Sequence, residues 1–216
     1  MPEDAQSDSE KLMKPSPQVY RFKITLQGVS PRVWRRIEVP SDYSLWDLHV
    51  AIQDVMGWLD YHLHGFYFQK GDKLVEIGIP EGEDNDSGVI AGWTVKMNQF
   101  FTGPGVVSRY AYDFGDDWQH DVTLEEILPR EFGVNYPRCI DGRQPCPPED
   151  CGGIEEYARF RRILRNPKHR EYAETAEWMA GMERLSGRRR FDERHPGNVR
   201  FDNPRTRWNN AFSGRR

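Results

Sequence analysis

The chain of 216 residues has only three cysteines, and all of them lie between Cys139 and Cys151. Cysteines so few and so clustered exclude a disulfide-framed secreted domain and indicate reduced thiols or a metal site. No apolar run approaches the ~20 residues that a membrane-spanning helix needs. The opening sequence, MPEDAQSDSEK, lacks the basic and apolar blocks of a secretory signal. We therefore expect a cytoplasmic protein.

Several motifs of common enzymes are also missing. The sequence contains no G-x-x-x-x-G-K-[ST], no G-x-G-x-x-G after a strand, no G-x-S-x-G and no H-E-x-x-H. Nucleotide hydrolysis, dinucleotide redox chemistry and serine hydrolysis through those motifs therefore have no support. The length nevertheless allows a substantial hydrophobic core.

Charge is divided unevenly along the chain, whose net charge is −4. Residues 187–216 carry nine arginines against three acidic residues, so this C-terminal extension is at +6 and the rest at −10. Its interleaved aromatics could stack on bases while the arginines hold phosphates, which keeps a nucleic-acid partner open. Attraction to the acidic body favours docking of the extension on its own domain instead. No membrane partner is expected.

The remaining sequence divides into a leader and one domain. Residues 1–18 are polar, acidic and rich in Pro and Ser, which predicts a disordered leader. Residues 19–186 form the predicted domain. Alternating apolar residues predict strands over 19–26 and 33–39. Apolar residues at helical spacing predict a helix over 45–56, preceded by a capping box of Ser44 and Asp47 and followed by Gly57 as the C-cap.

Further elements follow from the same periodicities. They are a strand over 65–69, a short helix over 94–101, a hairpin of strands 107–114 and 118–124, a Pro/Cys-rich loop over 136–153, and helices over 154–164 and 169–182. Local strand pairings followed by terminal helices predict a single α+β domain with a mainly antiparallel sheet.

The first candidate site is the hairpin turn, where Asp113, Asp116 and His120 lie within eight residues beside Trp118. Carboxylates bind oxygen-preferring cations and raise the pKa of a nearby histidine. The alternative is structural, because Asp is common in turns. His120 also shares its predicted strand face with Trp118 and Val122, which favours a packed histidine.

The second candidate is a metal site made by Cys139, Cys146 and Cys151 with His120. Zinc or another divalent ion would need four ligands, and the x6 and x4 gaps between these cysteines fit the usual paired spacing poorly. The alternative is three buried, reduced thiols that pack the loop.

Two more polar groups complete the candidates. Glu149 and Asp150 precede a predicted helix in the run PPEDCGG, where Asp150 could instead interact with the exposed amides of that helix. His62 and His64 would point the same way on a strand, a spacing compatible with a metal pair, although two such histidines are more often structural.

Long motifs give this sequence a resemblance to a known family. They are SPRVWRRI at 30–37, LH at 48–49 with GW at 57–58, HLH at 62–64, YDFGDDWQH at 112–120, the Cys139–Gly153 segment, and FDNPR at 201–205 with RW at 207–208. In this order they resemble the plasmid pRiA4b ORF-3-like family over about residues 19–212. The resemblance implies an uncharacterised protein, and the label of some members as TnpR-like passenger proteins of insertion sequences implies a link to mobile DNA. The chain lacks a resolvase pattern of nucleophilic Ser and catalytic Arg, so recombinase activity does not follow.

Our leading hypothesis is a ligand- or partner-binding domain, and whether the protein is an enzyme stays open. The polar site would be formed where the candidate segments converge, by His62, His64, Asp113, Asp116, Trp118, His120, Glu149 and Asp150. The alternatives are a metal-assisted hydrolase that uses the His, Asp, Glu and Cys side chains and a nucleic-acid-associated accessory protein of mobile elements.

Overall fold

The computed structural model describes residues 18–80, 88–187 and 191–212, and its centre is one eight-stranded sheet. The strand order is β5-β4-β3-β6-β7-β1-β2-β8, and every pair is antiparallel except β4 with β5. The strands are β1 (Gln18–Leu26), β2 (Trp34–Pro40), β3 (His64–Lys70), β4 (Lys73–Gly78), β5 (Ile90–Ala91), β6 (Val107–Tyr112), β7 (Trp118–Pro129) and β8 (Arg138–Arg143). Together with the four α-helices of the described residues, this sheet confirms the predicted α+β class.

Helix α1 (Leu45–Met56) forms where the apolar spacing predicts it. The Ser44 side chain accepts the Asp47 backbone N–H at 3.1 Å, and the Asp47 carboxylate accepts the Ser44 N–H at 2.8 Å. This reciprocal pair satisfies two amides that the first helical turn leaves free. Gly57 ends the helix in the left-handed region, with φ of 86°, which glycine adopts without strain.

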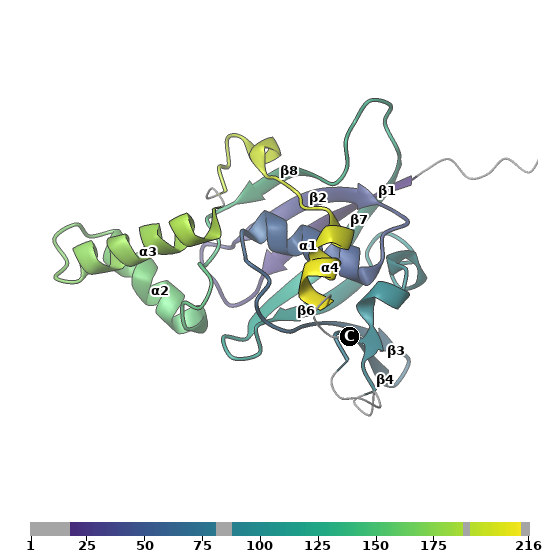
Figure 1. Cartoon of the computed structure of the whole chain (residues 1–216), viewed down its shortest axis with the longest axis horizontal. Helices are drawn as coiled ribbons and strands as arrows, with labels where there is room; N and C mark the ends of the chain where they lie inside the picture. The colour runs from purple at the N-terminus through teal and green to yellow at the C-terminus, as the bar shows by residue number, and fades with distance from the viewer. Residues whose placement is uncertain (1–17, 81–87, 188–190, 213–216) are drawn as a thin grey trace, which may run out of the picture.

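The sheet lies against one side of α1, and helix α4 (Pro204–Phe212) lies against the other (Figure 1). Hydrogen bonds join the layers: the Trp46 indole N–H donates to the Pro204 carbonyl at 3.1 Å, and Asp54 accepts the Asp202 N–H and the Arg207 guanidinium, each at 2.7 Å. All of α1 except Asp47 is therefore buried, including the polar residues His49 and Gln53. A helix covered on both sides can hold polar side chains away from solvent.

Helices α2 (Gly153–Leu164) and α3 (Tyr172–Ser186) pack on each other at one end of the molecule (Figure 1). The Phe160 and Trp178 rings join them, with centroids 5.1 Å apart. Tyr157 of α2 lies edge-on to Trp118 of β7, which attaches this pair of helices to the sheet.

Some elements differ from the prediction. The expected helix over 94–101 is two 3₁₀ turns, Gly92–Thr94 and Met97–Gln99, because the backbone leaves helical angles at Val95 and Lys96. The expected loop over 136–153 contains β8, which pairs with β2 although its sequence, RCIDGR, has little apolar alternation. The expected leader lies almost entirely outside the described residues, and Gln18 already belongs to β1. No helix among the described residues is long and apolar enough to cross a membrane.

Candidate functional site

Four of the predicted site residues meet at the surface: His62, Asp113, Glu149 and Asp150, which we call the His62 cluster. The His62 Nε2 atom lies 2.8 Å from an Asp150 oxygen, 3.6 Å from Asp113 and 3.9 Å from Glu149. Residues from three separate segments therefore place three carboxylates around one imidazole. The side chains of His62 and Asp150 are 32% and 57% exposed, so solvent reaches this cluster.

Backbone geometry aims the aspartates into this cluster. Asp113 follows β6 with φ of 55°, a left-handed conformation that Asp tolerates better than most residues. Its Oδ1 atom accepts the N–H of Gly115 at 3.0 Å, and Oδ2 is the atom that faces His62. Asp150 adopts a similar angle, with φ of 53°. The turn therefore fixes one carboxylate oxygen of Asp113 and presents the other.

Glu149 is the most firmly held member of the His62 cluster. Its carboxylate accepts a hydrogen bond of 2.5 Å from the Tyr112 hydroxyl and one of 2.7 Å from the Leu59 backbone N–H. Burial raises the pKa of Glu149 above its ordinary value, although both hydrogen bonds act in the opposite direction. The Glu149 carboxylate is thus pre-positioned at the inner side of the cluster.

Asp116 and Trp118 support this arrangement from the same hairpin. The Asp116 carboxylate accepts the Gly152 N–H at 3.0 Å and so ties the loop that carries Glu149 and Asp150 to the hairpin. Trp118 is buried against Trp58 and Tyr157 in the hydrophobic core. Asp116 therefore positions the loop, whereas Trp118 belongs to the hydrophobic core.

His120 lies in the core, away from the His62 cluster. Its ring contacts Trp58 and Tyr110 and is fully buried. Burial lowers the pKa of His120 to about 4, against the smaller effect of the backbone of Tyr110 and Trp118. His120 is therefore neutral at physiological pH.

The structure does not bring His120 and the three cysteines together. Cys139 lies on β8, and β1 and β2 separate that strand from β7, which carries His120. At a strand spacing of about 4.8 Å this separation is about 14 Å, far beyond a shared ligand distance. Burial raises the pKa of Cys139 and Cys151 to about 12, so both are thiols. Cys146 lies between the Arg35 guanidinium and the Met56 sulfur, at 2.9 and 3.2 Å.

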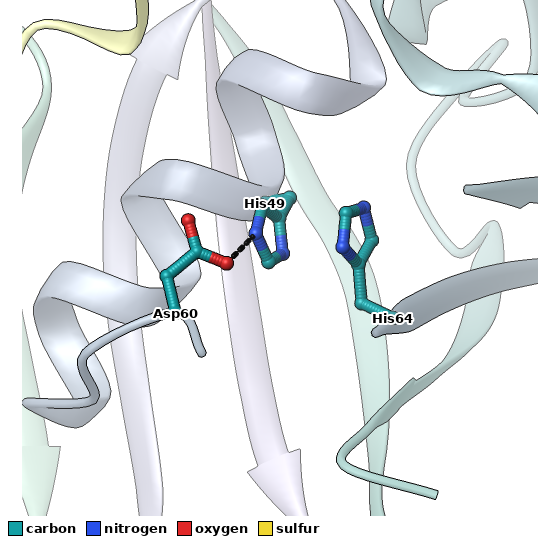
Figure 2. Close-up of side chains that lie close together, drawn as sticks. All are labelled: His49, Asp60 and His64. Carbon is teal, nitrogen blue, oxygen red and sulfur yellow. Dashed lines mark hydrogen bonds and ion pairs between the residues drawn. The ribbon is translucent and has the colours of Figure 1, made fainter. Parts of the chain in front are cut away.

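His64 belongs to a second, buried group with His49 and Asp60, which we call the His49 cluster (Figure 2). The His49 and His64 rings stack with centroids 3.5 Å apart and planes 9° apart. The His49 Nε2 atom lies 2.7 Å from Asp60 Oδ1, and His49 Nδ1 lies 2.9 Å from the Tyr110 hydroxyl. Helix α1, the loop before β3 and the first residue of β3 supply the three side chains.

In the His49 cluster, the surroundings favour a neutral His64 imidazole and an ionised Asp60 carboxylate. Burial, with a smaller contribution from His49, lowers the pKa of His64 well below its ordinary value, so this imidazole is neutral. Burial alone would raise the pKa of Asp60, but the charges and hydrogen bonds of His49 and Arg207 lower it overall. Asp60 is therefore a carboxylate next to neutral imidazole.

The sequence interpretation missed His49 and Asp60 as site residues. His49 lies four residues after Leu45, on the apolar side of the predicted helix, so its burial was readable from the periodicity. Asp60 lies four residues before His64, outside any helix or strand. No sequence pattern predicts that it contacts α1. Only the folded chain brings the two together.

A cavity of about 820 Å³ lies beside the His62 cluster. Leu59 and Glu149 line it, together with residues of α1, α3, the loop 146–148, Gly187 and the segment 191–202. Its wall includes the sulfur-containing side chains Met56, Cys146, Met179 and Met182. A ligand that fills this cavity would reach Glu149.

The sequence profile of the plasmid pRiA4b ORF-3-like protein family matches residues 18–196, which is most of the chain. The chain belongs to the plasmid pRiA4b ORF-3-like family. The resemblance of its motifs is thereby confirmed. Both the His62 cluster and the His49 cluster lie within the matched residues of this family member, whereas α4 follows them.

Two relatives of this family member have no assigned activity. It is 36% identical over 176 residues to the uncharacterized protein y4hQ of Sinorhizobium fredii (strain NBRC 101917 / NGR234), covering 81% of the chain and 88% of that relative. It is 40% identical, with a TM-score of 0.66, to the crystal structure of MM3350, a protein of unknown function from Methanosarcina mazei Go1. That match covers 76% of this chain and 90% of MM3350.

Proposed function

We propose that this chain is a ligand-binding domain whose site is the His62 cluster, and that its ligand is a divalent cation. The observation that carries the proposal is the position of His62, with its Nε2 atom within 3.9 Å of three carboxylates from three different residues. Imidazole and carboxylate are ligands that divalent metal ions share in proteins.

The charge of the cluster supports a cation. Asp113, Glu149 and Asp150 bring three carboxylates near one point, where like charges repel. The described contacts place one basic side chain among them, His62. A divalent ion would offset most of the negative charge of the three carboxylates and use the carboxylate oxygens that face His62. Manganese suits this mixture of hard oxygen ligands and one imidazole.

Calorimetry with Mn²⁺ tests the proposal directly. The full chain, treated with a chelator and then dialysed, is titrated with MnCl₂ alone. We expect one saturable site in the wild type, and about tenfold or greater loss of affinity in Asp150→Asn. Because Asp150 is 57% exposed, its substitution should leave the melting temperature of the metal-free protein nearly unchanged.

Asp117→Asn is the matched control. Asp117 is also an exposed aspartate with φ of 53°, and it lies on the same hairpin turn as Asp113. We expect this variant to bind Mn²⁺ like the wild type. Absence of saturable binding, or an equal effect of the two variants, would exclude the His62 cluster as the site.

Metal-assisted hydrolysis is the second candidate function. The observation that favours it is the solvent exposure of the His62 and Asp150 side chains, which leaves one side of a bound ion open to water and substrate. Mn²⁺-dependent cleavage of bis(p-nitrophenyl) phosphate should then be lost in Asp150→Asn and retained in Asp117→Asn. Absence of cleavage, or cleavage that does not depend on added metal, would exclude metal-assisted hydrolysis at this site and leave cation binding as the proposed function.

A further inference from the structure

We propose that the His49 cluster is a separate, buried site for a divalent transition-metal ion of the zinc type. Its ligands would be His49 Nε2, Asp60 Oδ1 and one ring nitrogen of His64. This site is independent of the His62 cluster, because it uses other side chains and lies between α1 and the sheet instead of at the surface.

The hydrogen bonding of His64 is the first argument. Both ring nitrogens of His64 are buried, and neither has a hydrogen-bond partner, although the residue is only 3% exposed. Burying polar atoms without a partner is costly, and most buried polar groups in proteins are satisfied. A metal ion would satisfy one nitrogen by direct coordination.

The geometry of the three ligand atoms is the second argument. The atoms offered by His49, Asp60 and His64 all lie within 4.8 Å of one another. A tetrahedral zinc ion with bonds of about 2.1 Å holds its ligands about 3.4 Å apart. The three ligand atoms are therefore close enough to share one ion, provided that the His64 ring turns out of its stack with His49 so that a ring nitrogen points at the ion. The ion would replace the hydrogen on His49 Nε2 that now faces Asp60.

Neighbouring side chains can orient these ligands in the way that metal sites require. When His49 coordinates through Nε2, its Nδ1–H can donate to the Tyr110 hydroxyl, 2.9 Å away. The Tyr110 hydroxyl can then donate to Gln53 once that amide turns over, since the Gln53 Oε1 atom is buried and has no partner in the present arrangement. Arg207 lies 3.3 Å from the second carboxylate oxygen of Asp60.

The ligand set also predicts which ions the site prefers. Two imidazoles and one carboxylate suit zinc, copper, iron and nickel, whereas magnesium and calcium take oxygen ligands. The His62 cluster has the opposite balance, with one imidazole and three carboxylates. The number of nitrogen ligands therefore distinguishes the two sites.

Electron paramagnetic resonance of bound Cu²⁺ tests this inference by counting nitrogens. One equivalent of Cu²⁺ is added to the full-length Asp150→Asn protein, in which the surface cluster is weakened. We expect hyperfine structure from two imidazole nitrogens. The same protein with His64→Leu should show fewer nitrogens and lose the rise in melting temperature that Zn²⁺ gives the Asp150→Asn parent.

The leucine variant also separates a metal ligand from a structural residue. An imidazole without hydrogen bonds can be replaced by an apolar side chain of similar size at little cost, so His64→Leu should be as stable as its parent without metal. If it fails to fold, Asp60→Asn replaces it, because Asn tolerates the φ of 64° at this position. A spectrum with one nitrogen, or a Zn²⁺ response unchanged by the variant that folds, would overturn the inference.

Discussion

The imidazole rings of His49 and His64 lie parallel and 3.5 Å apart, although one belongs to α1 and the other to the start of β3. The short segment from Asp60 to His64 contributes to this buried contact and also to the His62 cluster at the surface. Asp60 and His64 face α1, whereas His62 between them faces Asp113 and Asp150. One five-residue segment thus supplies ligands to both proposed sites.

Arg207 should be important for stability despite its place near the chain end. Its guanidinium pairs with Asp54 at 2.7 Å, with Asp60 at 3.3 Å and with Asp202, and its side chain is only 13% exposed. Arg207→Ala leaves two buried carboxylates without that partner, so we expect a loss of about 3 kcal/mol in the free energy of unfolding by urea.

Arg205→Ala provides the comparison for that experiment. Arg205 is exposed on the same helix, so its loss should change the unfolding free energy by less than about 0.5 kcal/mol. Equal effects of the two substitutions would show that α4 is not held to α1 by the Arg207 ion pairs.

Stability should fall in mild acid because of His120. Its pKa is about 4 in the folded protein and about 6.5 in the unfolded chain, so the unfolded chain takes up the proton first as pH falls. The stabilisation is complete above pH 6.5 and is lost between that pH and 4. We expect His120 to account for a loss of about 2 kcal/mol between pH 7 and pH 5.

Urea unfolding of His120→Leu at both pH values measures this contribution. The variant should show a smaller pH dependence than the wild type. Identical pH dependence in wild type and His120→Leu would mean that His120 is not held neutral in the core.

Gly153 should be needed at the junction of the hairpin and α2. A Cβ atom there would lie 3.0 Å from the Asp116 carbonyl oxygen, and the backbone has φ of 78°. Gly153→Ala should therefore cost about 1–3 kcal/mol of stability and weaken Mn²⁺ binding, because the Asp116–Gly152 hydrogen bond holds the loop of Glu149.

Gly197→Ala is the matched control, since its φ is not in the left-handed region and nothing lies within 4 Å of the added atom. Its melting temperature and Mn²⁺ affinity should match those of the wild type. A Gly153→Ala protein that also matches would remove the hairpin–loop contact from our account of the site.

A nucleic-acid partner of the C-terminal extension stays a prediction. Among its described arginines, Arg207 is engaged by carboxylates, whereas Arg200 and Arg205 are exposed. We expect the wild-type protein to show no salt-dependent DNA binding that is lost in the double variant Arg200→Ala/Arg205→Ala. A gel shift at low and high salt measures this binding. DNA binding that weakens with salt and is lost in the double variant would instead favour a nucleic-acid-associated accessory protein.

The hydrophobic periodicity predicted the helices and strands that have one apolar face. It missed the elements that form only by pairing or packing with other parts of the chain. The alternation over 19–26 and the helical spacing over 45–56 match β1 and α1. By contrast, β8 forms at a sheet edge by pairing with β2, and α4 is amphipathic only weakly and forms against α1. Local sequence does not encode those partners.

The same distinction applies to the sites. Four candidate residues do meet in the His62 cluster, because turn residues and histidines with a chemical role stand out in the sequence. His64 was paired with His62 by its spacing, but the two point to different neighbours because the chain around Asp60 and His62 precedes β3 and does not follow a strand. The helical spacing indicated that His49 is buried, but it gave no sign of its partners Asp60 and His64, which come from outside the helix.

Anomalous diffraction from crystals of the full chain grown with Zn²⁺ is the sharpest test of the proposed metal site at the His49 cluster. Data collected on both sides of the zinc absorption edge should show a peak within bonding distance of His49 Nε2, Asp60 Oδ1 and a His64 ring nitrogen. A His64 ring that contacts only water or protein, with no anomalous peak between it and Asp60, would show that the His49 cluster does not bind zinc.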